Sequence, residues 1–337
     1  MKAALVTNQA PGGKRSRLED NLPLMTPYVV QIFPIYACNF KCEYCHFSIE
    51  KDKRKFVTEQ ISMDFELYKK CVDDMCSFPD KIRTLRFVGM GEPLLHKDLA
   101  KMIAYTKEKQ IANRVELITN ASLLSHEIAD SLIEAGLDRM VISIQGTDAI
   151  KYEQISHVKI DYEEFVEGIR YFYQNKKNTH VYIKVVDVAL EDEKDKQKFY
   201  DIFGDICDSI AIETAIPLYP DVEYNEVLAQ QKQVTQYGTE VQKTNICPQP
   251  FYFMQVNPDG NVVGCHSISP YPEIFGNALS ENVCEIWTGK KYNQFRRKML
   301  DGKEQVCACC DECTLMEYRT FEEDRIDAKK DRLKDVY

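Results

Sequence analysis

Between residues 28 and 216, short runs of β-branched and aromatic residues alternate with segments whose apolar residues recur at helical spacing. In such a chain, the apolar faces of the strands and of the helices are buried when the helices pack against a parallel sheet with right-handed crossovers. Six strands, fewer than the eight of a closed barrel, favour a partial (β/α)6 barrel of the α/β class. The expected strands span residues 28–35, 84–89, 114–120, 139–146, 180–190 and 209–216.

The pattern changes near residue 218, where a polar, Gln-rich stretch begins. Residues 251–265 predict a β-hairpin around Asn-Pro-Asp-Gly, and residues 285–300 predict a helix. The core is therefore expected to carry a small, cysteine-rich extension made of a hairpin and a helix. The expected division is an N-terminal extension (1–27), a barrel core (28–217), a connector (218–246), a cysteine-rich domain (247–314) and a helical tail (315–337).

Charge and hydropathy exclude several classes of protein. A net charge of -10 and a pI near 5.3 argue against a nucleic-acid-binding surface. No run approaches the roughly 18–20 apolar residues of a membrane span, and the N-terminus lacks the apolar segment of a signal peptide. We therefore expect a cytoplasmic protein without nucleic-acid or membrane partners, in which thiols stay reduced.

Thirteen cysteines in such a chain indicate metal binding or catalysis rather than disulfides. Cys38, Cys42 and Cys45 lie in the segment CNFKCEYCHF, directly after the first expected strand. A zinc site and a redox pair are the alternatives, but structural zinc usually takes four ligands, and a C-x-x-C redox pair would leave the third cysteine without a role. An iron–sulfur cluster with three protein ligands would leave one iron open for chemistry. The position at a strand's carboxyl end favours this cluster.

The triplet resembles the C-x3-C-x-aromatic-C motif of the radical S-adenosylmethionine (SAM) superfamily, with Tyr44 at the aromatic position. The resemblance implies that the three cysteines hold a catalytic [4Fe-4S] cluster whose fourth iron binds the methionine end of SAM. It implies reductive cleavage of SAM to a 5′-deoxyadenosyl radical, with a reductant such as flavodoxin or ferredoxin. Tyr44 is then expected to lie near the adenine.

The segment FVGMGEPLLH, after the second expected strand, resembles the Gly-Gly-Glu-Pro motif of the same family. A glycine-rich turn lets the backbone approach a ligand closely, and an ionised Glu92 suits a cationic amino group. An ordinary strand-to-helix turn is the alternative for this segment taken alone. The resemblance implies cofactor contacts for Gly89, Gly91, Glu92 and Pro93.

Three later segments resemble the family at further strand ends. ITNASLL carries Asn120, followed by Ala121 where the family usually has glycine. VISIQG carries Ser143, which the resemblance places near the ribose, and Lys184 stands where the family often keeps a cation for the methionine carboxylate. Ordinary strand positions remain the alternative for Ser143 and Lys184.

A second group of cysteines resembles the auxiliary-cluster extension called SPASM, or its short form, twitch. The spacing of Cys247, Gly260 and Cys265 matches its opening, and the segment CACCDEC at 307–313 offers the closing C-x2-C pair. A zinc ribbon is the alternative reading of these residues. With the resemblance, we expect one auxiliary [4Fe-4S] cluster on Cys247, Cys265, Cys310 and either Cys307 or Cys313.

The resemblance implies a reaction class but no substrate, because function lies in the site rather than the fold. Family members with one auxiliary cluster include an aminocyclitol dehydrogenase, in which that cluster accepts an electron. Peptide-modifying members often carry a leader-recognition domain before the triplet, whereas 37 residues precede Cys38 here. We expect dehydrogenation or epimerisation of a small polar molecule such as a sugar or aminocyclitol. Modification of a ribosomally made peptide or protein side chain is the alternative.

Overall fold

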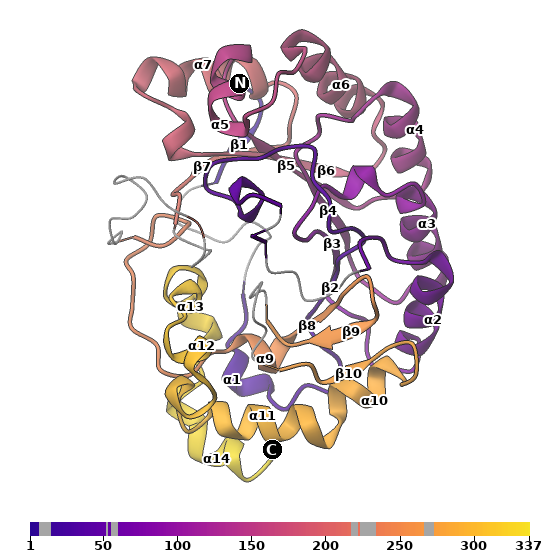
Figure 1. Ribbon diagram of the computed structural model, residues 1–337, viewed down its shortest axis with the longest axis vertical. Helices are drawn as coiled ribbons and strands as arrows, with labels where there is room; N and C mark the ends of the chain where they lie inside the picture. The colour runs from indigo at the N-terminus through magenta and orange to yellow at the C-terminus, as the bar shows by residue number, and fades with distance from the viewer. Residues whose placement is uncertain (7–14, 52, 55–59, 217–221, 223–233, 266–272) are drawn as a thin grey trace.

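The protein is described here from a computed structural model, which covers residues 1–6, 15–51, 53–54, 60–216, 222, 234–265 and 273–337 (Figure 1). In this part of the chain, ten strands form one sheet in the order β1-β7-β6-β5-β4-β3-β2-β8-β9-β10. The six central strands are parallel, which confirms the expected α/β fold with a mostly parallel sheet. They are β2 (Val29–Ile32), β3 (Thr84–Phe87), β4 (Val115–Thr119), β5 (Arg139–Ile144), β6 (His180–Val186) and β7 (Ser209–Glu213).

Helices cover the outer, convex face of this curved sheet (Figure 1). Asp64, Ser125 and Asp161 begin three of them, each accepting a hydrogen bond from a first-turn amide. The amphipathic helices turn apolar stripes towards the strands, such as Leu67, Tyr68, Cys71, Val72 and Met75 of α2. The helices of this layer are α2 (Phe65–Met75), α3 (Leu99–Lys109), α4 (His126–Glu134), α5 (Ala149–Ser156), α6 (Tyr162–Asn175) and α7 (Glu193–Phe203).

The concave face of the sheet carries charged side chains. Register places Arg86, Glu116 and Arg139 side by side on β3, β4 and β5. Glu116 is 1% exposed and accepts hydrogen bonds from both arginines, with Arg139 Nη1 at 2.7 Å from Glu116 Oε2. Removing one partner of such a buried group leaves an uncompensated charge, so these pairs fix the local register.

Two expected elements end or break well inside their expected ranges. The strand expected over 180–190 ends at Val186, because Asp187–Ala189 form a 3-10 turn in which Asp187 Oδ1 accepts a hydrogen bond from Ala215 N at 2.9 Å. The helix expected over 285–300 is two helices, α10 (Val283–Thr288) and α11 (Lys290–Met299). They break at Gly289, whose backbone is extended with ψ 159°.

The sheet extends beyond the expected strands at both edges. β1 (Ala4–Leu5) pairs in parallel with β7, which the sequence did not predict. At the other edge the expected hairpin forms from β8 (Phe253–Val256) and β9 (Asn261–Val263), followed by β10 (Gly276–Asn277). β8 also pairs in parallel with β2, so the cysteine-rich region continues the barrel sheet.

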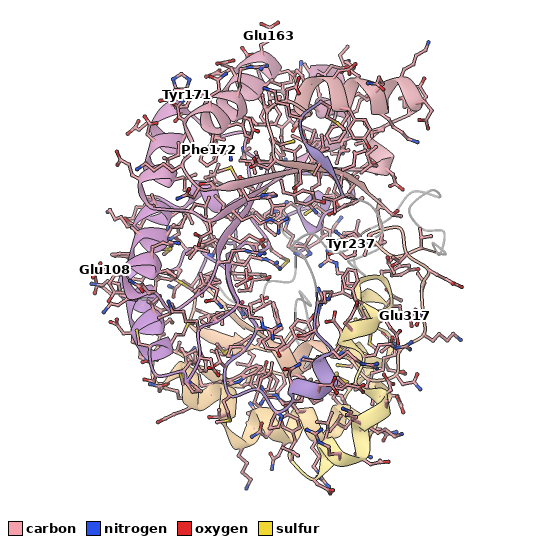
Figure 2. The ribbon with its side chains drawn as sticks, turned by 180° about the vertical axis from the view of Figure 1, so that it is seen from behind. Glu108, Glu163, Tyr171, Phe172, Tyr237 and Glu317 are labelled. Carbon is pink, nitrogen blue, oxygen red and sulfur yellow. The ribbon has the colours of Figure 1, made fainter. Side chains whose placement is uncertain are left out.

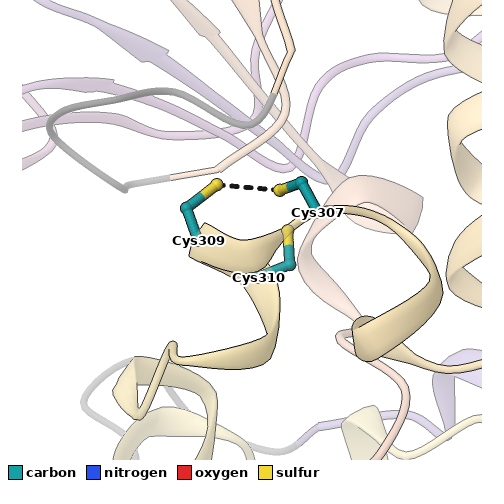
Figure 3. Close-up of side chains that lie close together, drawn as sticks. All are labelled: Cys307, Cys309 and Cys310. Carbon is teal, nitrogen blue, oxygen red and sulfur yellow. Dashed lines mark hydrogen bonds between the residues drawn. The ribbon is translucent and has the colours of Figure 1, made fainter.

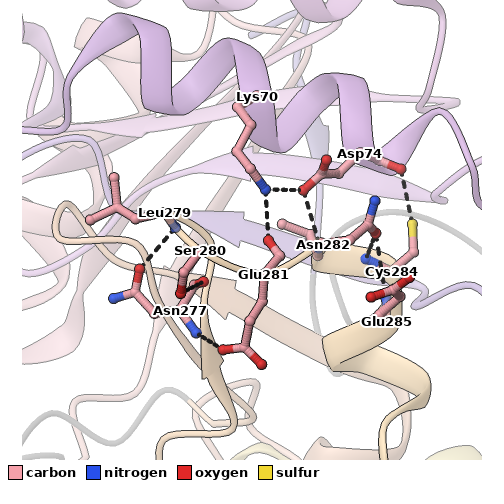
Figure 4. Close-up of polar contacts among 10 residues, drawn as sticks. Lys70, Asp74, Asn277, Leu279, Ser280, Glu281, Asn282, Cys284 and Glu285 are labelled. Atoms are coloured by element: carbon pink, nitrogen blue, oxygen red, sulfur yellow. Dashed lines mark hydrogen bonds and ion pairs between the residues drawn. The ribbon is translucent and has the colours of Figure 1, made fainter.

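Polar contacts fasten α10 to α2 (Figure 4). Lys70 Nζ binds Asp74 Oδ2 at 2.7 Å and donates to the carbonyl of Glu281 at 2.6 Å. The same carboxylate accepts from Val283 N at 3.0 Å, and Cys284 Sγ donates to the Asp74 carbonyl at 3.1 Å. The cysteine-rich region is therefore anchored on a barrel helix, and Cys284 has a structural contact there.

Of the C-terminal helices, α12 (Ala308–Asp311) and α13 (Leu315–Arg319) lie on the concave side of the sheet, whereas α10 lies beside α2 of the outer layer (Figure 1). Tyr237 lies between the sheet and the helix that carries Glu317, and it stacks on Phe321 with ring centroids 5.0 Å apart (Figure 2). No helix among the described residues has both the length and the apolar character needed to span a membrane. The remaining short helices are α1 (Leu18–Asn21), α9 (Gln249–Tyr252), α14 (Lys330–Lys334) and the 3-10 turns His46–Ser48, Pro93–Leu95, Lys303–Gln305, Glu322–Asp324 and Asp327–Lys329.

Candidate active site and cysteine pocket

The cysteine triplet lies in the loop that leaves β2 at the carboxyl edge of the sheet. Cys42 is 8% exposed, while Cys38 and Cys45 are partly buried. The loop closes on itself through a hydrogen bond from Cys45 N to Cys42 O at 2.8 Å. It is fastened to α5 by bonds from Lys41 N and Glu43 N to carbonyls near the end of that helix. These backbone hydrogen bonds hold the loop in one conformation against α5.

The triplet fits an iron–sulfur cluster better than a single ion. Among the described residues, the three sulfurs of the triplet do not all lie within 4.8 Å of one another, whereas those of Cys307, Cys309 and Cys310 do. Wider spacing suits thiols that each bind a different iron. Burial raises the pKa of Cys38 to about 12 and raises the pKa of Cys42 well above its usual value. Such thiols keep their protons until a metal displaces them.

The glycine-rich turn after β3 packs directly against the chain that leads into the triplet. A side chain at Gly89 would place its Cβ 2.7 Å from the ring of Phe33. At Gly91 the Cβ would lie 2.3 Å from the carbonyl oxygen of Ile35 and 2.7 Å from that of Ala37. The next amide, Glu92 N, donates to Ala37 O at 2.7 Å. Close packing and this hydrogen bond therefore fix the position of the chain that enters the cysteine loop.

Glu92 joins the carboxyl ends of β3 and β4. Its 2%-exposed carboxylate accepts hydrogen bonds from Leu94 N at 3.0 Å, Thr119 Oγ1 at 2.5 Å and Asn120 N at 2.7 Å. Pro93 follows as the first residue of a 3-10 turn. Burial outweighs these hydrogen bonds and raises the pKa of Glu92 to about 7.

The raised pKa of Glu92 has a measurable consequence for stability. Between its usual pKa of 4.5 and about 7, the folded protein keeps a proton that the unfolded chain releases, so the free energy of unfolding should fall as pH rises through this window. Between pH 4.5 and 7.5, the free energy of unfolding of the wild type should fall by up to about 3 kcal/mol relative to that of Glu92→Gln. Urea unfolding of the metal-free proteins at pH 4.5, 6 and 7.5 measures the difference, and parallel pH profiles would contradict it.

Asn120 extends this network to the cysteine loop. Its Nδ2 donates to Asn39 Oδ1 at 3.0 Å, and Asn39 Nδ2 donates to Ser122 Oγ at 2.8 Å. Ser122 Oγ donates back to Asn120 Oδ1 at 2.7 Å. Ala121 has φ 58°, a left-handed conformation that costs an alanine roughly 1 kcal/mol and explains the expectation of glycine there. Sequence reasoning missed Asn39 and Ser122, although Asn39 lies inside the quoted triplet.

A pocket opens at the carboxyl ends of β5, β6 and β7, with about 700 Å³ of atom-free space that is partly open to solvent. It brings together four residues that the sequence singled out: Tyr44, Cys45, Ser143 and Lys184. The hydroxyl of Tyr44 donates to Gln145 Oε1, and Gln145 Nε2 donates to the carbonyl of Ser143 at 3.1 Å. One wall of the pocket is therefore fixed by contacts between the cysteine loop and β5.

Glu213, which sequence reasoning missed, organises the opposite wall. This buried carboxylate accepts hydrogen bonds from Lys184 Nζ at 2.7 Å, Tyr182 OH at 3.0 Å and Gln236 Nε2 at 2.7 Å. Burial alone would raise the pKa of Glu213, but Lys184 and the other donors outweigh it and hold the pKa below its usual value. Lys184 thus has a charged partner, and its contact with a methionine carboxylate stays a prediction. The signal for Glu213 was a carboxylate inside an otherwise mostly apolar expected strand, residues 209–216.

A second pocket, with about 490 Å³ of partly open atom-free space, lies among the C-terminal cysteines. Five cysteines line it: Cys247, Cys265, Cys309, Cys310 and Cys313. Cys307 is not among the lining residues, and its sulfur lies 2.8 Å from that of Cys309 (Figure 3). Sequence reasoning did not select Cys309. The lining is otherwise mostly apolar, so converging thiols in an apolar wall fit a buried cluster.

A parallel partial barrel with three thiols beyond its first central strand defines one class of enzyme. The chain belongs to the Radical SAM superfamily, whose family model matches residues 32–197. The model of the SPASM iron-sulfur cluster-binding domain matches residues 247–314. The protein is accordingly a radical SAM enzyme that uses SAM and a [4Fe-4S] cluster and carries a further iron–sulfur region. This confirms the resemblance drawn from the motifs.

Three similar proteins indicate the range of this class. The tungsten-containing aldehyde ferredoxin oxidoreductase cofactor-modifying protein of Pyrococcus furiosus is 23% identical over 84% of this chain and 86% of its own. The S-adenosyl-L-methionine-dependent 2-deoxy-scyllo-inosamine dehydrogenase of Niallia circulans is 23% identical over 85% and 92%. The structure of Streptococcus suis SuiB bound to precursor peptide SuiA covers 91% of this chain and 78% of that one, with 14% identity and a TM-score of 0.62. The last likeness shows the fold alone.

Proposed function

We propose that this enzyme oxidises a small polar molecule, such as a sugar or aminocyclitol, by removing a hydrogen atom from one of its carbons. Epimerisation at the same carbon is the related outcome. When bound, the catalytic cluster delivers an electron that cleaves SAM to a 5′-deoxyadenosyl radical. The observation that carries the proposal is the pocket at β5–β7, where Cys45 of the triplet shares a wall with Tyr44, Ser143 and Lys184.

The chain's own residues have three tasks in this proposal. Cys38, Cys42 and Cys45 hold the cluster, with flavodoxin or ferredoxin as the reductant. The carboxylate of Glu92 accepts a hydrogen bond from the amino group of SAM, supported by its burial beside the triplet. Tyr44, fixed through its bond to Gln145, borders the adenine. Each task is one of positioning and exclusion of water, as cofactor chemistry requires.

For the cysteine pocket we propose one auxiliary [4Fe-4S] cluster, held by Cys247, Cys265, Cys310 and Cys313. Support comes from their shared place in the pocket lining, which Cys307 does not join. Cys310 and Cys313 form the C-x2-C pair, and four thiols suffice for four irons. When bound, such a cluster would supply an acceptor for the second electron of a substrate oxidation, with the accompanying proton released to solvent.

Iron counting distinguishes the two candidate closing cysteines. Anaerobically reconstituted wild type should hold about eight irons per chain. Cys313→Ala should reduce this to about four or five, while Cys307→Ala, the matched control, should retain about eight. The reverse order would move the ligand to Cys307, and about four irons in the wild type would remove the auxiliary cluster from the proposal.

The substrate class rests on comparison and on pocket size. The inosamine dehydrogenase is similar over most of both chains, and the pocket of about 700 Å³ must hold SAM as well as the substrate, which leaves room for a small molecule. Peptide modification is the second candidate, favoured by the fold shared with SuiB in complex with its precursor peptide. Reconstituted enzyme, SAM and dithionite should form 5′-deoxyadenosine faster with a substrate sugar than without it. Stimulation by peptides and by no sugar or aminocyclitol would favour the second candidate.

A further inference from the structure

Arg319 reaches the pocket at β5–β7 from the far end of the chain. It is the last residue of α13, which follows the cysteine-rich region, yet it lines the same pocket as Lys184 and Glu213. Nothing in the motifs of the barrel or of the cysteine-rich region selects this arginine. Its position therefore brings a cation to the proposed substrate site from outside both motif sets.

Gln236 holds Arg319 in place. The amide of Gln236 donates to the carbonyl of Tyr318 at 3.0 Å, and its carbonyl accepts from Thr214 N, just beyond β7, at 2.9 Å. Its side chain accepts a hydrogen bond from Arg319 Nε at 2.8 Å while donating to Glu213. Tyr318 itself is 3% exposed. The arginine is thus linked to the end of β7 through both backbone and side-chain contacts.

The charges lining the pocket do not cancel. Lys184 is neutralised by Glu213, with Nζ and Oε2 at 2.7 Å. Arg319 donates to a neutral amide, and no described carboxylate lies within 4.0 Å of its guanidinium. The positive charge of the partly buried Arg319 is therefore not neutralised by a described carboxylate and attracts an anion. Its Nε is bonded to Gln236, which leaves the two terminal nitrogens of the planar guanidinium for a bidentate contact.

We propose that Arg319 binds an oxyanion of the substrate, a carboxylate or a phosphate. The inference rests on the proposed function and narrows it, because a cation at this position favours a sugar or cyclitol that carries a carboxylate or phosphate over its neutral counterpart. Arg319 then determines specificity, while the radical chemistry proceeds at the other wall of the pocket.

Binding measurements on SAM-loaded, reconstituted holoenzyme test this. The probes are gluconate and glucose 6-phosphate, with neutral glucose for comparison. Wild type should bind at least one anionic probe roughly tenfold more tightly than glucose, and Arg319→Gln should lose that advantage. Arg319→Lys, which keeps the charge without the fork, should retain part of it. The stronger of the two anions identifies carboxylate or phosphate as the group recognised.

Arg170→Gln is the matched control, since Arg170 is on the outer helix α6 and pairs only with Glu167 there among the described residues. It should leave the binding of every probe unchanged. Iron content and the melting temperature of each variant report whether α13 and the cysteine pocket remain folded. Equal binding of the anions by wild type and Arg319→Gln, or no preference of the wild type for either anion, would overturn the proposal.

If Arg319→Gln also loses affinity for SAM, the arginine binds the cofactor instead of the substrate, and the proposal for Arg319 is overturned.

The proposed function is tested by a different measurement. If wild type forms no 5′-deoxyadenosine from SAM and dithionite, the radical SAM activity fails whatever the anions do. If it forms 5′-deoxyadenosine but Arg319 does not affect anion binding, only the assignment of Arg319 fails.

Discussion

Replacing Cys42 by alanine is expected to lower the rate of 5′-deoxyadenosine formation at least about a thousandfold, equivalent to about 4 kcal/mol of activation free energy. Cys42 is the most buried thiol of the triplet. Without Cys42, two irons of the cluster would lack a protein ligand: the one that Cys42 binds and the one that SAM occupies. The measurement is anaerobic SAM cleavage with dithionite, together with the cluster's visible absorbance.

Cys71→Ala is the control for Cys42→Ala. Cys71 is fully buried in α2, away from both cysteine groups, so alanine leaves only a small cavity that costs about 1 kcal/mol. Its SAM cleavage and iron content should match those of the wild type. Turnover retained by Cys42→Ala would contradict the assignment of the triplet as the catalytic cluster site.

Gly91→Ala is expected to reduce SAM cleavage about a hundredfold and to destabilise the fold by about 3 kcal/mol. The new Cβ would lie 2.3 Å from Ile35 O, a backbone atom that moves only with the chain leading to Cys38. Overpacking costs about 1–3 kcal/mol, and a displacement of about 1 Å at a reacting centre can cost about 10²-fold in rate. Urea unfolding and SAM cleavage measure the two effects separately.

Gly136→Ala separates this steric effect from the general cost of replacing a glycine. Gly136 ends α4 with φ 79°, and its nearest new contact would be Lys107 Cε at 3.7 Å. Strain of about 1 kcal/mol is expected there, with SAM cleavage unchanged. Equal losses of cleavage in the two variants would show that Gly91 has no special relation to the cysteine loop.

The fold was predictable from the sequence where one pattern governs one element. Buried parallel strands read as continuous apolar runs, and the six central strands were all located from the sequence. The pairing of β8 with β2 was not predictable, because a hairpin sequence specifies its own two strands and not the edge it joins. The break at Gly289 lay inside a continuous helical pattern that a single glycine does not always interrupt.

The residues of the candidate site also fall into two groups, those that local motifs predict and those that only the tertiary structure brings together. The triplet and the glycine-rich turn are local motifs, so their residues were named in advance and the structure places the turn against the chain that enters the triplet. Glu213, Gln236 and Arg319 meet through contacts between segments far apart in sequence. Such a site depends on tertiary placement, which no spacing within one segment encodes.

Helix α13 has five residues and touches both pockets: Leu315 and Met316 line the cysteine pocket, and Arg319 lines the pocket at β5–β7. A helix this short has little stability of its own and takes its order from what it packs against. Anything that orders one of its ends lowers the entropic cost of binding at the other, and thermodynamic linkage makes this assistance equal in both directions. With the occupants proposed above, α13 would couple the filling of the cysteine pocket to substrate binding at Arg319, so holoenzyme should bind substrate more tightly than cluster-free protein.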